Sequence, residues 1–92
     1  MKILLNKCYG GFGIKDEILN EIWSNVDDYI SDDEMRVNAD LIAMKENGED
    51  VEGGYSKLVV VDVPDTATDW TIIDYDGMER LIAVENGKLV FY

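Results

Sequence analysis

Two short turns near the end of the chain constrain the fold more than any other feature of the sequence. Asp76-Gly77 and Asn86-Gly87 are both favoured for type I′ turns, which connect neighbouring antiparallel strands. They separate three segments rich in β-branched and aromatic residues, "DWTIIDY", "MERLIAVE" and "KLVFY". The sequence therefore predicts a three-stranded antiparallel meander in the last third of the chain.

Counting outward from the turns predicts the register of this meander. The expected cross-strand pairs are Glu85 with Lys88, Val84 with Leu89, Ile82 with Phe91, and Leu81 with both Ile72 and Tyr92. Apolar pairs then line both faces of the meander. One face should contact the helices, and the other should contact a partner or a loop.

The same register predicts one unfavourable pair. Asp74 should lie directly opposite Glu79, and like charges at such positions are destabilising. We therefore expect either a bulge in this hairpin or a basic side chain beside the two carboxylates. Arg36 and Arg80 are the internal candidates, because a guanidinium group can bind a carboxylate through two hydrogen bonds.

The first two thirds of the chain contain strand and helix patterns. "KILLNKCY" predicts a buried strand, and "KLVVVDV" predicts another that Pro64 ends. Between them we expect an amphipathic helix over residues 16–30, the polar connector "SDDEMR", and a second helix, "ADLIAMKEN", capped by Asn38 and ended by Gly48. The apolar positions that define the first helix are Ile18, Leu19, Ile22, Trp23, Val26, Tyr29 and Ile30.

These elements combine into a single domain over residues 1–92, because a chain of this length supports one hydrophobic core. The expected order is β-α-α-β-β-β-β, which is an α+β fold. We expect one mixed, mainly antiparallel sheet of four or five strands, with two helices packed on one face.

Composition narrows the classes of function. The chain has no histidine, which removes the commonest general base and metal ligand, and its single cysteine, Cys8, cannot form an internal disulfide. Without a recognisable pair of nucleophile and base, we expect no catalytic site, no cofactor and no metal, and therefore no enzyme. No apolar run reaches the ~18 residues of a membrane span, and "MKILLNKCYGG" is too polar for a signal peptide, so we expect a soluble, cytoplasmic protein.

Charge is unevenly distributed along the chain. The formal net charge of −12 should repel nucleic acid and anionic membranes and attract basic surfaces. Residues 1–15 contain Lys2, Lys7 and Lys15 and no acidic residue, whereas residues 16–54 contain thirteen acidic residues against two basic ones. The N-terminal segment is therefore the one locally basic part of an acidic chain.

That basic segment contains a glycine-rich corner between the first predicted strand and the first predicted helix. Backbone N–H groups at such a corner can bind an anion, although the sequence matches neither a dinucleotide fingerprint nor a P-loop, and the glycines can equally serve close packing. The candidate ligand-binding residues are Lys7, Tyr9, Gly10, Gly11, Phe12, Gly13 and Lys15. Tyr9 or Phe12 would stack on a base, and the lysines would neutralise phosphate.

The acidic run "DDYISDDEM" is a second candidate site. It could imitate the charge of nucleic acid and bind a basic protein, together with the carboxylates of residues 46–52; a solvated acidic face is the alternative interpretation. The candidate partner-binding residues are Asp27, Asp28, Asp32, Asp33 and Glu34. Neither this run nor the group of Asp74, Asp76 and Glu79 has the ligand spacing of an EF-hand.

Three segments resemble a family of short bacteriophage and prophage proteins: "NKCYGGFG", "LIAMKENGEDVEGGYSKLVVVDVPD" and "IIDYDGME". Lys15 stands where members of that family usually have a serine, and Ala39 stands where they often have a proline. The resemblance implies a phage source and transfers no activity. Small phage proteins of this kind are frequently accessory factors, many of which antagonise host defence.

Two hypotheses about function follow. The first is a non-enzymatic phage accessory protein, acting against host defence, that captures a small phosphorylated, nucleotide-like ligand at the glycine-rich corner. The alternative is an acidic inhibitor that mimics nucleic acid and binds a basic host protein, such as a CRISPR or restriction nuclease. We expect no direct nucleic-acid or membrane partner, and the apolar meander makes a homodimer reasonable.

Overall fold

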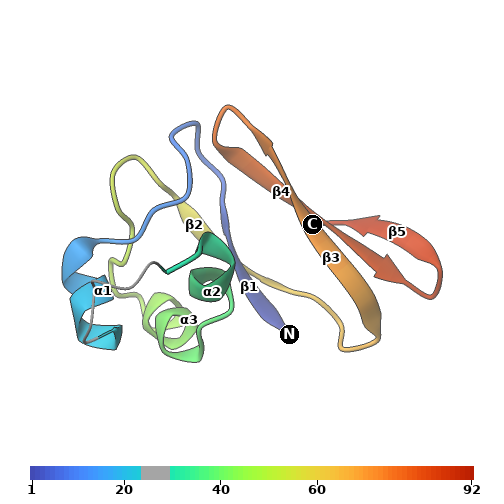
Figure 1. The fold of residues 1–92 in the computed structure, drawn as a ribbon, viewed down its shortest axis with the longest axis horizontal. Helices are drawn as coiled ribbons and strands as arrows, with labels where there is room; N and C mark the ends of the chain where they lie inside the picture. The colour runs from blue at the N-terminus through green and yellow to red at the C-terminus, as the bar shows by residue number, and fades with distance from the viewer. Residues whose placement is uncertain (24–29) are drawn as a thin grey trace.

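Three helices and five strands make up the fold in the computed structural model, which describes residues 1–23 and 30–92 (Figure 1). The elements are β1 (Lys2–Asn6), α1 (Asp16–Ile22), α2 (Asp32–Arg36), α3 (Ala39–Glu46), β2 (Leu58–Asp62), β3 (Ala67–Tyr75), β4 (Met78–Glu85) and β5 (Lys88–Phe91). They confirm the α+β class and the C-terminal meander. Within the described residues, no helix has the length and apolar character needed to cross a bilayer.

The strands form two antiparallel sheets where the sequence predicted one mixed sheet. β1 pairs with β2, and β3, β4 and β5 form the meander. The division occurs at Pro64, which has no N–H to donate to a ladder and whose carbonyl accepts a hydrogen bond from the Ala67 N–H in a turn. The chain therefore leaves the first sheet at this point, and the meander begins a second one.

Alternating apolar residues on β1 and β2 place this two-stranded sheet in the middle of the molecule. Leu4 faces the helices, whereas Ile3 and Leu5 face the meander. The helix-side core contains Leu4, Ile14, Leu41, Ile42, Val51 and Leu58, and the meander-side core contains Ile3, Leu5, Val63, Leu81 and Ala83. The fold thus has three layers, with β1 and β2 between the helices and the meander, as Figure 1 shows.

The register predicted for the meander is confirmed. The structure pairs Glu85 with Lys88, Val84 with Leu89, Ile82 with Phe91 and Ile72 with Leu81, and Leu81 and Tyr92 exchange backbone hydrogen bonds. Both turns have the positive φ angles that type I′ geometry requires, 52° at Asp76 and at Asn86. The turn sequences were therefore sufficient to fix which side chains share a face.

The helices differ from the predicted ones. The segment read as a polar connector contains α2, because the Ser31 hydroxyl accepts a hydrogen bond from the Glu34 N–H and caps it. α1 ends at Ile22, and Ile30 is not helical; Val26 and Tyr29 lie outside the described residues. Ile18, Leu19 and Ile22 of α1 are partly buried and pack against the helix-side core, so the apolar face of this helix contacts the core. α3 begins after Asn38, as predicted, with the side-chain cap to the Leu41 N–H.

Candidate functional site

The glycine-rich corner, residues 6–15, is packed against two other loops. An added Cβ at Gly10 would lie 2.7 Å from the Cβ of Tyr55, and one at Gly77 would lie 2.8 Å from the backbone nitrogen of Gly10. Gly77 belongs to the turn between β3 and β4, which lies beside the corner in Figure 1. Glycines on both sides of this contact allow backbones to approach where side chains would clash. The corner therefore has the packing role that the sequence left open as an alternative.

The lysines of the corner are directed to different parts of the molecule. Lys7 Nζ donates to the backbone oxygens of Glu79, at 2.8 Å, and Tyr92, at 3.5 Å. Lys15 Nζ binds Asp50 Oδ2 at 2.7 Å, and this hydrogen bond raises the pKa of Lys15 and lowers the pKa of Asp50. One ammonium group thus ties the corner to the meander and the other ties it to the loop after α3.

The aromatic residues of the corner also have different environments. Phe12 packs against the helix-side core, and the guanidinium carbon of Arg36 lies 4.2 Å from the centre of its ring. Tyr9 is 62% exposed. Of the two rings expected to stack on a base, only Tyr9 faces solvent.

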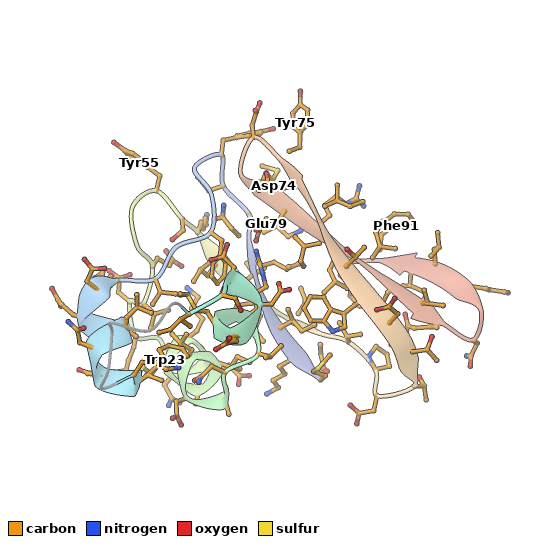
Figure 2. The ribbon with its side chains drawn as sticks, viewed as in Figure 1. Trp23, Tyr55, Asp74, Tyr75, Glu79 and Phe91 are labelled. Atoms are coloured by element: carbon orange, nitrogen blue, oxygen red, sulfur yellow. The ribbon has the colours of Figure 1, made fainter. Side chains whose placement is uncertain are left out.

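Arg36 completes a buried polar network that joins the three layers. Its guanidinium nitrogens Nη1 and Nη2 donate to the two carboxylate oxygens of Glu79, and Nη1 also donates to the Leu4 carbonyl at 3.1 Å. Glu79 Oε1 accepts a further hydrogen bond of 2.8 Å from the Asn6 N–H. The basic side chain expected beside the Asp74–Glu79 pair is therefore Arg36, and the register of that pair is confirmed. Figure 2 shows Asp74 and Glu79 near one another.

This network also bears on the group of Asp74, Asp76 and Glu79. Both carboxylate oxygens of Glu79 accept hydrogen bonds from Arg36, and Asp74 Oδ1 accepts one from the Gly77 N–H at 2.7 Å. In residues 1–23 and 30–92, no three acidic or cysteine side chains are placed to hold a metal ion together. Asp74 and Glu79 therefore both form hydrogen bonds within the protein at the end of the hairpin.

An acidic hollow lies beside the corner and was not identified from the sequence. Its volume is about 560 Å³, and it is lined by Ile14, Lys15, Asp16, Glu17, Asp50, Glu52, Gly53 and Gly54. The lining thus contains four carboxylates and one ammonium group. Its two halves are 35 residues apart, and they are held together by the Lys15–Asp50 pair and by the hydrogen bond that the Gly53 N–H donates to the Gly13 carbonyl.

The charges in this hollow are only partly compensated. Glu52 Oε1 binds Lys45 Nζ at 2.6 Å, and this hydrogen bond lowers the pKa of Glu52. Asp16 and Glu17 are exposed at the start of α1, and neither forms an ion pair within the described part of the chain. The hollow is therefore suited to a positively charged group.

The acidic run predicted as a partner-binding surface is described in part. Asp32, Asp33 and Glu34 are exposed in the first turn of α2, where Asp33 Oδ1 lies 3.6 Å from Arg36 Nε. Asp27 and Asp28 lie outside the described residues. Asp32 and Glu34 form no ion pair within those residues, so they add to the unpaired negative charge of the helical layer.

Comparisons with protein-family models, with curated proteins and with solved structures give no match. The resemblance to small phage proteins therefore stays a prediction.

Proposed function

We propose that this protein is a non-enzymatic binding protein that docks its acidic surface on a basic protein and receives a lysine or arginine side chain in the acidic hollow. The observation that carries the proposal is the charge of the hollow, which has four carboxylates against one ammonium group in its lining. That ammonium group, on Lys15, is already bound to Asp50. Asp16 and Glu17 are left to attract a cation from outside.

The overall charge supports the same partner. A net charge of −12 favours encounter with a basic surface and disfavours encounter with nucleic acid or phosphate. The exposed carboxylates of α2, on Asp32, Asp33 and Glu34, extend the negative surface of the helical layer. Proteins that bind nucleic acid present the complementary surface, rich in lysine and arginine. The further step, that the partner is a host nuclease, rests on the resemblance to phage proteins.

The nucleotide-binding hypothesis has less in its favour. Lys7 is held by two carbonyl oxygens and Lys15 by a carboxylate, and Phe12 is engaged with Arg36. A phosphate at the corner would also lie near the carboxylates of the hollow. We therefore favour the acidic docking surface.

A binding assay with a fluorescent arginine-rich peptide tests the proposal. The site variant, Asp16→Asn with Glu17→Gln, removes two charges from the hollow. The control, Asp40→Asn with Asp65→Asn, removes two charges elsewhere, and Asp40 matches Asp16 because both lie in the first turn of a helix. Exposed ion pairs contribute about 0.2–1 kcal/mol each, so we expect the site variant, which loses two, to bind about two- to thirtyfold more weakly and the control to change little.

Each alternative outcome would be informative. Equal weakening by both variants would show that only total charge matters, and it would refute the hollow as the receiving site. Peptide binding that is absent even at low ionic strength would refute the docking function as a whole.

A further inference from the structure

The face of the meander that points away from β1 and β2 is apolar, and it is left uncovered by residues 1–23 and 30–92. We call it the outer face; its large apolar side chains are Ile73, Met78, Ile82, Val84, Leu89 and Phe91, with Tyr75 opposite Met78. Ile73 is 46%, Leu89 63% and Phe91 53% exposed. Figure 2 shows Phe91 on the side of the meander away from the helices. Contiguous patches of this kind on soluble proteins usually mark an interaction surface.

The outer face carries few charged side chains, although the chain as a whole is strongly acidic. Alternation along the paired strands gives it one basic side chain, Arg80, and one acidic side chain, Asp69. The guanidinium carbon of Arg80 lies 5.5 Å from the centre of the Phe91 ring, which directs its charge over the apolar surface. In a chain of net charge −12, a neutral face of this composition needs a partner with little net charge at the point of contact.

We propose that a second copy of this chain covers the outer face and forms a two-fold dimer. The register places Ile73 opposite Arg80, Thr71 opposite Ile82, and Asp69 opposite Val84. Arg80 and Asp69 therefore lie on either side of the level of Thr71 and Ile82. Consider a two-fold axis that lies between the two faces and runs across the strands at that level. It places Arg80 of each copy near the Asp69 end of the other copy.

This symmetry gives two reciprocal charge contacts around an apolar centre. A two-fold interface uses the same patch on both subunits, so a face with one positive and one negative end is complementary to itself. A dent of about 80 Å³, lined in part by Thr71, Ile82 and Leu89, adds a recess for an apolar side chain of the other copy. Two sheets packed face to face in this way are a common arrangement of antiparallel strands.

The size and charge of the protein limit the strength of this dimer. β4 is eight residues long, so the outer face measures roughly 25 by 15 Å at about 3.3 Å per residue and about 4.8 Å between strands. Two such patches in contact cover roughly 750 Å², which is below the about 1,200–2,000 Å² of stable interfaces, so we expect a weak dimer that forms at high micromolar concentrations. The charge of −12 on each copy opposes association, so salt should strengthen the dimer. Binding of a basic protein by the acidic hollow should respond to salt in the opposite direction.

Analytical ultracentrifugation over a range of concentrations and salt tests the proposal. The wild-type chain should pass from monomer to dimer as concentration and salt increase. Leu89→Lys should remain monomeric although it lowers the net negative charge. Tyr55→Lys, at an 83% exposed position on a loop outside the meander, is the matched control and should dimerise as the wild type does. Circular dichroism of each variant verifies that it folds.

A charge exchange tests the symmetry itself. Arg80→Asp and Asp69→Arg should each weaken dimerisation about tenfold or more, and the double variant should recover it. A wild-type chain that stays monomeric at high salt, a dimer that Leu89→Lys leaves intact, or a double variant without recovery would each overturn the proposed dimer. Binding of a different protein to the outer face of a monomer would overturn it as well.

Discussion

Arg36 and Glu79 form a two-point ion pair between side chains that are 5% and 4% exposed and lie 43 residues apart in the chain. The pair connects α2 to β4 across the edge of β1, whose Leu4 carbonyl and Asn6 N–H join the same network. Removing one member leaves the other charge buried. The two residues thus make the position of the helical layer depend on the meander.

Replacement of Glu79 by glutamine should destabilise the protein strongly. The glutamine amide would keep an acceptor for the Asn6 N–H but would leave the Arg36 charge without a counter-ion. Loss of one partner of a buried pair typically costs about 3–5 kcal/mol. Urea unfolding measures the change. The control is Glu46→Gln, which breaks the exposed pair with Lys2 and should leave the midpoint nearly unchanged; similar shifts for both variants would contradict this account.

Alanine at Gly77 should be more harmful than alanine at Gly87. Both glycines follow the first turn residue and have positive φ, 90° and 75°, so each substitution carries a backbone cost of about 1–2 kcal/mol. Only at Gly77 would the new Cβ also collide with the backbone of the glycine-rich corner. We expect the loss of unfolding free energy at Gly77 to be at least twice that at Gly87. Equal losses would show that the corner moves aside easily.

Acid should remove the contribution of the Lys45–Glu52 pair. The hydrogen bond from Lys45 lowers the pKa of Glu52 from its ordinary value of 4.5, so the folded state binds this proton less readily than the unfolded state. The stabilisation is therefore complete above pH 4.5 and declines as pH falls through the lower pKa of the folded protein. The difference in urea midpoint between wild type and Glu52→Gln should shrink from neutral pH to about pH 3. A difference independent of pH would contradict this.

Nucleotides should leave the thermal stability of the protein unchanged. A ligand that binds only the folded state raises the melting temperature, and Lys7 and Lys15 already have partners within the protein. Differential scanning fluorimetry with mono-, di- and cyclic nucleotides measures this. A rise in melting temperature that Lys15→Gln abolishes would restore the glycine-rich corner as an anion site.

Local sequence predicted the parts of the fold that depend on neighbouring residues. The Asp76-Gly77 and Asn86-Gly87 turns determine the register of the meander by themselves, and Asn38 marks the start of α3. The conflict between Asp74 and Glu79 even indicated Arg36 as one of two compensating residues. α2 was missed because its acidic residues resemble a solvated connector, although Ser31 and Glu34 form the start of a capped helix.

The remaining features depend on contacts between distant segments. Apolar residues on both faces of β1 are compatible with the middle of one large sheet and also with a two-stranded sheet covered on both sides, which is what forms. The acidic hollow combines the start of α1 with residues 50–54, and no spacing within either segment indicates the other. The roles of Lys7 and Lys15 were likewise hidden, because their partners lie far along the chain.

The central position of β1 has a consequence for the order in which the protein can fold during synthesis. β1 leaves the ribosome before the segments that complete its environment, because it pairs with Leu58–Asp62 and its meander side packs against Leu81 and Ala83. This apolar strand therefore stays unpaired until β2 has been translated, and its meander side stays exposed until β4 follows. Such long-range pairing slows folding and leaves apolar surface of the nascent chain exposed in the meantime.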